Sequence, residues 1–154
     1  MKIKLISISR KEENFVKEGC SYYFNKLKHY CTFEEKLIKA PKENSRQLQL
    51  KTEAVLIQKE ISGVDMVVLL VENGKQFSSI QLSEFISKKQ STSVKQLVFV
   101  IGGAYGFDES LHQCIKTKIS LSSLTLPHQL AKLLFTEQLY RAFTILRNEK
   151  YHHE

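Results

Sequence analysis

The stretch VFVIGGAYGF, residues 98–107, decides how this chain folds. It opens with an apolar run rich in β-branched and aromatic residues, which is typical of a strand buried on both faces. The run ends in Gly102 and Gly103, and Gly106 follows shortly after. Because glycine lets the backbone come close to a neighbouring group, the loop either lies against a bound ligand or only makes a tight turn.

Strands and helices alternate on both sides of this stretch. A second apolar run, MVVLLV at residues 66–71, is also expected to be a buried strand, and Asn73-Gly74 is expected to turn the chain after it. The other expected strands cover residues 2–9, 32–39, 97–101 and 118–121. The expected helices cover residues 12–30, 45–61, 79–90, 108–116 and 127–147. This alternation predicts one α/β domain over residues 1–154, with a mainly parallel sheet and helices on both faces.

The spacing of the glycines, GGxxG, matches neither of two common phosphate-binding motifs. It differs from the G-x-G-x-x-G of dinucleotide-binding folds and follows a late strand, and the chain has no G-x-x-x-x-G-K-[ST]. In open α/β sheets, ligands bind beyond the carboxyl ends of the strands. Both apolar strands end in turn residues, so we expect the ligand site at that edge.

The segment SLSSLTLPHQLAKLLFTEQLYRAFTIL, residues 120–146, is the second informative stretch. Hydroxyl residues alternate with leucines up to Leu126, so polar groups and leucines fall on opposite sides, and such a segment can enclose an adenine. Pro127 suits the first position of a helix, and Thr125 is a candidate cap. The helix that follows has a wide apolar face, which packs either deep against the sheet or against a second copy of the chain.

The composition is that of a basic globular protein. Lys and Arg number 23 against 16 Asp and Glu, giving a net charge of +7. This surplus either serves a polyanion such as RNA, DNA or an anionic membrane, or is only an excess of lysine. Cys20, Cys31 and Cys114 form no CxxC pair, so we expect neither a metal site nor a disulfide framework, and reduced thiols fit the cytoplasm. We expect no membrane span, since no apolar stretch approaches the ~20 residues that one needs.

The chain ends in Tyr151-His152-His153-Glu154. Chain termini usually fray, and two adjacent histidines make a poor metal site without further ligands. The tail is therefore either unstructured or functional.

Taken together, IGGAYGF, the 120–145 block and YHHE, in this order and spacing, resemble the RlmH family. These are small SPOUT-class methyltransferases that act on pseudouridine in large-subunit (23S) ribosomal RNA. The resemblance spans the whole chain. It implies an α/β fold with a C-terminal trefoil knot that holds S-adenosylmethionine, and a homodimer.

The resemblance also assigns site residues. The family's terminal Tyr-His pair, which is tied to activity, falls on Tyr151 and His152. The family's cofactor contacts fall on Leu70, Gly102, Leu121, Ser122, Ser123, Leu124, Thr125 and Leu126.

Two positions depart from the family pattern. Ala104-Tyr105 follows the glycine pair, where the family often has proline or another small residue. His153 stands where the family often has arginine. Histidine is mostly neutral at pH 7 and cannot form the bidentate fork of arginine, so one RNA contact of the family is in doubt here.

The implied reaction is methyl transfer from S-adenosylmethionine to N3 of a pseudouridine in a 23S stem-loop on the assembled ribosome. His152 is the preferred general base, with Tyr151 orienting or stacking on the uracil, and His128 is the second candidate. Three alternatives stay open: a SPOUT enzyme for another RNA position, a non-catalytic basic RNA-binding protein, and a nucleotide-dependent oxidoreductase, which lacks its glycine fingerprint here. The candidate RNA-contacting cations are Lys2, Lys4, Arg10, Lys11, Lys132, Arg147 and Lys150.

Overall fold

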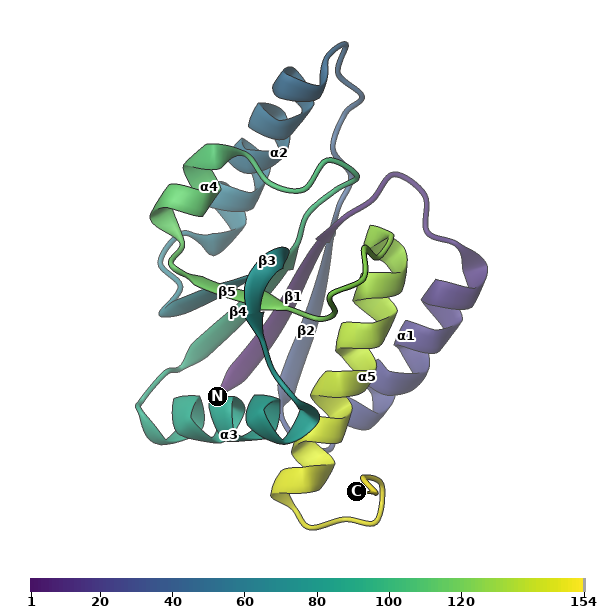
Figure 1. Cartoon of the computed structure of the whole chain (residues 1–154), viewed down its shortest axis with the longest axis vertical. Helices are drawn as coiled ribbons and strands as arrows, with labels where there is room; N and C mark the ends of the chain where they lie inside the picture. Colours follow the sequence, from purple (N-terminus) through teal and green to yellow (C-terminus); the bar gives the residue numbers. More distant parts are fainter. Residues whose placement is uncertain (154) are drawn as a thin grey trace.

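The computed structural model describes residues 1–153, and Glu154 of the predicted tail lies outside the described residues. Five parallel strands form one sheet in the spatial order β2-β1-β4-β3-β5 (Figure 1). The strands are β1 (Lys2–Ile8), β2 (Thr32–Ile38), β3 (Met66–Gln76), β4 (Gln96–Ile101) and β5 (Thr117–Ser120). The two fully apolar runs are β3 and β4, and both lie inside the sheet, as the sequence predicts.

Helices connect the strands and cover both faces of the sheet. They are α1 (Asn14–Leu27), α2 (Arg46–Ile61), α3 (Ser79–Ser91), α4 (Glu109–Cys114) and α5 (His128–Leu146). Helices α1, α3 and α5 lie on one face, and α2 and α4 lie on the other (Figure 1). The predicted α/β architecture with a parallel sheet is confirmed.

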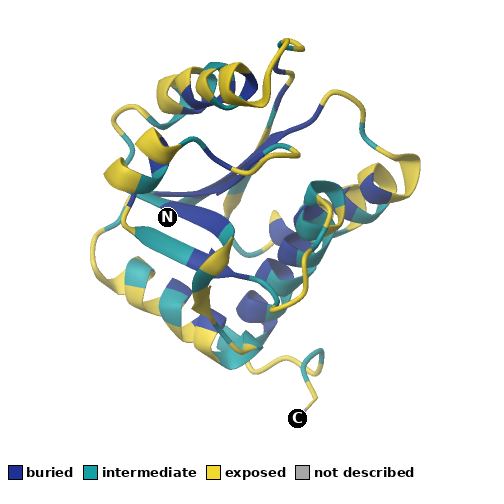
Figure 2. Cartoon of the chain, turned by 45° about the horizontal axis from the view of Figure 1, so that its top comes forward, coloured by how far each residue is buried: buried dark blue, intermediate teal, exposed yellow. Residues whose placement is uncertain are grey.

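Each face of the sheet has its own apolar core. In β4, Leu97, Phe99 and Ile101 face α1, α3 and α5, while Val98 and Val100 face the other layer, because successive strand side chains alternate. The ring of Phe99 packs 4.6 Å from that of Phe135 on α5, measured between centroids. Figure 2 shows the middle of the sheet as buried, and burial on both faces explains why the runs 66–71 and 97–101 contain no alternating polar residues.

Polar side chains mark where several helices begin. The hydroxyl of Ser45 accepts a hydrogen bond from the Leu48 N–H, and Ser78 and Gln81 form a reciprocal capping box at α3. The expectation that Thr125 caps the last helix is wrong. Pro127 occupies the cap position of α5, and no side-chain cap is formed there.

The expected turn at Asn73-Gly74 is also wrong, because β3 continues to Gln76. The pairing of β3 with β5 shifts register between Leu70 and Lys75, and the end of β3 then crosses β5 (Figure 1). A Cβ atom on Gly74 would lie only 2.5 Å from the carbonyl carbon of Ile119 in β5. Glycine is needed here for a close crossing of two backbones, not for a turn.

Across residues 1–153, no helix is long and apolar enough to cross a membrane.

Candidate functional site

The three segments assigned to the cofactor come together at the carboxyl edge of the sheet. Leu70 in β3 is paired with Ile101 of β4 on one side and with Ile119 of β5 on the other. Gly102 directly follows Ile101, and the segment 121–126 begins two residues after Ile119. Parallel pairing therefore brings three segments, far apart in sequence, to one place.

The glycine loop is a tight turn whose own atoms fill the space beside Gly102. The Gly106 N–H donates to the Gly103 carbonyl at 3.1 Å, and Gly106 has a φ of +79°, which favours glycine. A Cβ on Gly102 would lie 2.5 Å from the Gly106 carbonyl oxygen. A side chain at residue 102 would thus collide with this loop before it reached any cofactor.

The segment 121–126 is anchored at its start and exposed further on. The Ser120 hydroxyl donates to the Ser122 carbonyl, and the Leu124 N–H donates to the Ser122 hydroxyl, both at 2.9 Å. Leu121 packs against the core, whereas the Leu124 side chain is 73% exposed. The segment thus presents apolar surface at the edge of the sheet.

A cleft of about 480 Å³ lies beside the glycine loop. Its walls come from the end of β1 and the residues after it, the loop before α2, residues 103–105, and the start of α5. Arg10 and Lys11, expected as RNA contacts, line it together with Lys42 and Arg46. The sequence analysis missed the last two. Lys42 and Arg46 follow an expected parallel strand, residues 32–39, and this position alone would have placed them at the carboxyl edge of the sheet.

His128 also lines this cleft, at the start of α5. Burial lowers its pKa below the usual 6.5, so its imidazole is neutral at pH 7 and able to accept a proton. Next to it, the Gln129 amide donates to the Lys11 carbonyl and accepts from the Glu13 N–H, at 2.9 and 2.7 Å. These bonds fix the start of α5 against the loop that follows β1.

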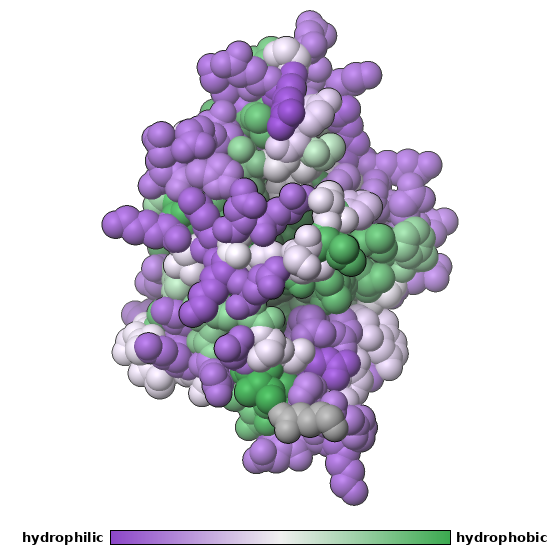
Figure 3. Space-filling view, in the orientation of Figure 1, coloured by the Kyte–Doolittle hydropathy of each residue, from purple (hydrophilic) through white to green (hydrophobic). Residues whose placement is uncertain are grey.

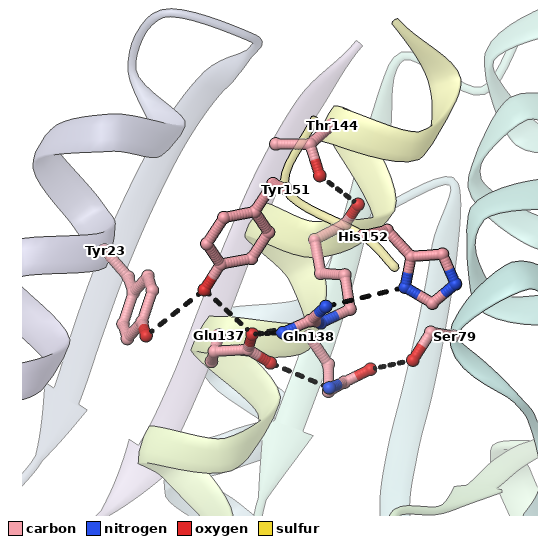
Figure 4. A network of polar contacts seen from close by, with 8 residues as sticks. Tyr23, Ser79, Glu137, Gln138, Thr144, Tyr151 and His152 are labelled. Atoms are coloured by element: carbon pink, nitrogen blue, oxygen red, sulfur yellow. Dashed lines mark hydrogen bonds and ion pairs between the residues drawn. The ribbon is translucent and has the colours of Figure 1, made fainter. Parts of the chain in front are cut away.

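The tail is packed on the protein at Tyr151 and His152. The Tyr151 hydroxyl donates to Glu137 Oε1 at 3.0 Å (Figure 4). The Arg141 guanidinium carbon lies 4.7 Å from the centre of the Tyr151 ring. Burial, together with the neighbouring Tyr23 and Glu137, raises the pKa of the Tyr151 hydroxyl, which therefore stays protonated at pH 7. Nδ1 of His152 lies 3.5 Å from Nη1 of Arg141, and Nε and Nη2 of the same guanidinium donate to Glu137 Oε1 at 3.0 and 2.6 Å.

Within one chain, however, the tail and the cofactor segments lie apart. The partners of Tyr151 and His152 described above lie on α1 and α5, and the tail folds back along α5 as far as Glu137. Of these partners, Glu137 lies nearest to the start of α5, and as the tenth of its 19 residues it is about 14 Å along the helix from His128, with the segment 121–126 before that first residue (Figure 1). The structure brings Leu70, Gly102 and the segment together but does not bring the tail to them.

Two of the cations expected to contact RNA are buried in ion pairs. Lys4 is 7% exposed, and its Nζ lies 2.7 Å from Glu60 Oε2. Lys132 is 3% exposed and is bound by Glu12 and Glu35. The expectation is wrong for these two, since both are already neutralised inside the fold. No cluster of three or more His, Cys, Asp or Glu suited to a metal occurs in residues 1–153.

Comparison with known proteins decides the family. A family model described as predicted SPOUT methyltransferase matches residues 1–152. The chain belongs to the SPOUT methyltransferase family. A protein of Christiangramia forsetii is 47% identical to this SPOUT methyltransferase over 99% of both chains, and one of Parabacteroides distasonis is 46% identical over 100% of both. Both relatives are named ribosomal RNA large subunit methyltransferase H, and the resemblance found in the sequence is confirmed.

Solved structures agree with the fold of a SPOUT methyltransferase. A probable methyltransferase from Bordetella pertussis aligns with a TM-score of 0.60 at 12% identity, covering 92% of this chain and 93% of that one. The tRNA (m1G37) methyltransferase from Aquifex aeolicus aligns with a TM-score of 0.56 at 12% identity, covering 92% of this chain and 70% of that one. At these identities the likeness concerns the fold alone.

Proposed function

We propose that this SPOUT methyltransferase transfers a methyl group from S-adenosylmethionine to N3 of a pseudouridine. The substrate is a stem-loop of 23S ribosomal RNA in the assembled ribosome, in the cytoplasm. The observation that carries the proposal is the full-length identity of 46–47% to proteins named ribosomal RNA large subunit methyltransferase H. The net charge of +7 supports an RNA substrate.

We assign the cofactor to the edge where the three segments meet. The residues that would hold it are Leu70, Gly102, Leu121, Ser122, Ser123, Leu124, Thr125 and Leu126. They fit an adenosine group, because strand pairing brings Leu70 and Gly102 beside the segment 121–126, where the Leu124 side chain is exposed and offers an apolar surface. The cofactor supplies a methyl group already activated by its sulfonium charge, and the protein's task is positioning. We also propose that the chain is knotted here, and the close crossing at Gly74 supports this.

The protein's remaining task is to take the proton from uracil N3. A positioned base typically contributes about 10²–10⁴-fold to such a step. We assign this role to His152, with Tyr151 orienting the uracil, because Tyr151 is bound to Glu137 and His152 lies beside Arg141, 3.5 Å from its Nη1. His128 is the second candidate, since its lowered pKa keeps it neutral beside the glycine loop.

We propose that two copies of the chain form the working enzyme. Phe15, Leu124 and Leu130 are 58%, 73% and 41% exposed. Figure 3 shows an apolar patch over the amino-terminal ends of α1 and α5. A second copy would cover this patch. It would also supply its tail to a cofactor site that the tail of the same chain does not reach.

The test is mass spectrometry of ribosomal RNA from a strain lacking this protein. We expect one pseudouridine of a 23S stem-loop to lose its methyl group there and to regain it when the purified protein and S-adenosylmethionine are added to the ribosomes. A methyl group missing at another RNA position would identify a different SPOUT activity. No change in the RNA, with no heat of binding for millimolar S-adenosylmethionine in calorimetry, would favour a non-catalytic RNA-binding protein.

A further inference from the structure

We infer that the cleft beside the glycine loop holds the RNA nucleotide that receives the methyl group, with its backbone phosphate at Arg10 and Arg46 and its base against Tyr105. This inference rests on the proposed function and names the residues that grip its substrate.

The position of the cleft is the first argument. Gly103, in its wall, directly follows Gly102, and His128 lies two residues after Leu126. Two of the three cofactor segments therefore continue directly into the walls of the cleft. A group bound in it lies beside the proposed cofactor site, where a methyl acceptor must be.

The charge of the cleft is the second argument. Its lining carries four basic side chains, Arg10, Lys11, Lys42 and Arg46, and two acidic ones, Glu43 and Glu53. Glu43 is engaged by the Thr52 hydroxyl, which donates to it at 3.0 Å, and Glu53 is only 6% exposed. The accessible charge is positive, which suits the phosphate of a nucleotide.

A buried polar network builds the floor of the cleft and orients Arg10. The Gln49 amide donates to Glu53 Oε1 at 2.8 Å and to the Pro41 carbonyl at 3.1 Å. Both donors of the Gln49 amide nitrogen are engaged in this way. The amide oxygen of Gln49 accepts from the Arg10 guanidinium at 2.9 Å. The cation is thus held by side chains that are themselves fixed, rather than being left free on the surface.

Glu53 also retains an unused acceptor at this place. Its Oε2 is buried without a hydrogen-bond partner among the described residues, and a Cβ on Gly103 would lie 2.8 Å from it. An unpartnered buried oxygen costs free energy, which a donor brought by a ligand would recover. A nucleotide carries such donors in its ring N–H groups and its ribose hydroxyl.

Tyr105 provides the surface for the base. It is 50% exposed at the cleft, and the Arg46 guanidinium carbon lies 5.5 Å from the centre of its ring. Proteins that recognise single RNA bases stack them on such aromatic or guanidinium planes after the base has left its helix. An exposed ring beside a cation therefore fits a splayed-out uracil.

The experiment measures methylation of ribosomes by single variants with matched controls. Arg46→Ala should raise KM for ribosomes about tenfold and reduce the slope of log affinity against log salt by about one, as expected for one lost phosphate contact. Lys59→Ala, which removes an exposed cation of the same helix outside the cleft, should change neither. Tyr105→Leu should lower kcat/KM by about tenfold or more, while Tyr105→Phe keeps the stacking and stays near wild type.

Two further measurements separate the possible failures. S-adenosylmethionine affinity and the unfolding temperature should stay at wild-type values in these variants, so that a loss of activity is a loss of RNA contact. A photo-reactive p-benzoylphenylalanine at position 105 should crosslink to the methylated stem-loop, whereas one at position 88, exposed on α3 and outside the cleft, should not. The inference is overturned if the Arg46 and Tyr105 variants methylate ribosomes as well as wild type does, or if position 105 crosslinks to a ribosomal protein. In either case the proposed function still stands. If wild type methylates no ribosomal RNA, the proposed function fails and the inference fails with it.

Discussion

Gly74 lies where β3 crosses β5, and the crossing leaves no room for a methyl group. A Cβ there would lie 2.5 Å from backbone that cannot turn away. We therefore expect Gly74→Ala to lower the free energy of unfolding by about 3 kcal/mol or more. Gly19→Ala is the matched control, since its Cβ would meet only the flexible end of Leu133 and the helix gains about 1 kcal/mol from alanine.

Urea unfolding of the two variants checks this prediction. Equal midpoints for Gly74→Ala and Gly19→Ala would mean that β3 and β5 are not in close backbone contact.

Glu60 is expected to make the protein sensitive to acid. Its hydrogen bond to Lys4, with that to Lys36, lowers the pKa of the Glu60 carboxyl below 4.5 in the folded state. The stabilisation is therefore complete above pH 4.5 and is lost as the pH falls through the lowered value. We expect Glu60→Gln to cost about 2 kcal/mol at pH 7, because the buried Lys4 amine then keeps only the longer contact to Glu34, at 3.8 Å.

Unfolding free energies measured from pH 7 to pH 3 test this effect. The difference between wild type and Glu60→Gln should shrink toward zero as the pH falls. A difference that stays constant over this range would show that the carboxylate charge contributes nothing.

Individual residues were the hardest part to predict from the sequence. Lys4 and Lys132 were expected to face RNA, but each is neutralised by carboxylates that lie far from it along the chain. The network of Arg10, Gln49 and Glu53 was missed for the same reason, because it exists only once β1 and α2 lie side by side. Leu70 and Gly102 were assigned to the cofactor through the resemblance to the family, and parallel strand pairing explains why they lie close together.

At the scale of elements, α5 is fixed to the sheet by a buried charge. Lys132 is 3% exposed between Glu12 before α1 and Glu35 in β2. Its hydrogen bonds to these two carboxylates outweigh the effect of burial and raise the lysine pKa, so the amine stays charged. We expect Lys132→Met to destabilise the protein by about 3–5 kcal/mol, because two carboxylates are left close together without a cation.

The triple variant Lys132→Met, Glu12→Gln, Glu35→Gln is the control, and we expect it to recover most of this loss. Urea midpoints give both values. A single variant as stable as wild type would show that the ion pairs do not hold α5 in place.

The elements themselves follow largely from the sequence. Long apolar runs and helical periodicity predicted every strand and helix, with the largest error at β3, which extends five residues beyond the expected end, to Gln76. The errors came where tertiary packing overrides a local signal. Asn73-Gly74 is a strong turn signal, yet the chain uses its glycine for a backbone crossing, and Thr125 is displaced as a cap by Pro127.

At the scale of the whole molecule, the separation of tail and cofactor site predicts complementation between two inactive chains. A chain without residues 151–154 keeps the cofactor segments, and a Gly102→Val chain keeps the tail but has a distorted glycine loop. Each alone should be inactive. Mixed dimers should regain about a quarter of wild-type methylation with random pairing, since half the dimers are mixed and each has one complete site.

The measurement is methylation of ribosomes by co-expressed chains carrying different affinity tags. The tail-less chain should also keep its S-adenosylmethionine affinity in calorimetry. Absence of any recovery, with both chains folded and dimeric in ultracentrifugation, would assign each tail to the site of its own chain.

The strand order also constrains how the protein is made. β1 is synthesised first, but its neighbour β4 begins only at Gln96, so one side of β1 stays open until nearly two thirds of the translation is complete. The outer edge of β3 stays unpaired for longer, because its partner β5 begins only at Thr117. A nascent chain paused between these points would expose an apolar strand edge of the kind that aggregates. The sheet of a protein proposed to modify ribosomes is therefore completed only late in its own synthesis on a ribosome.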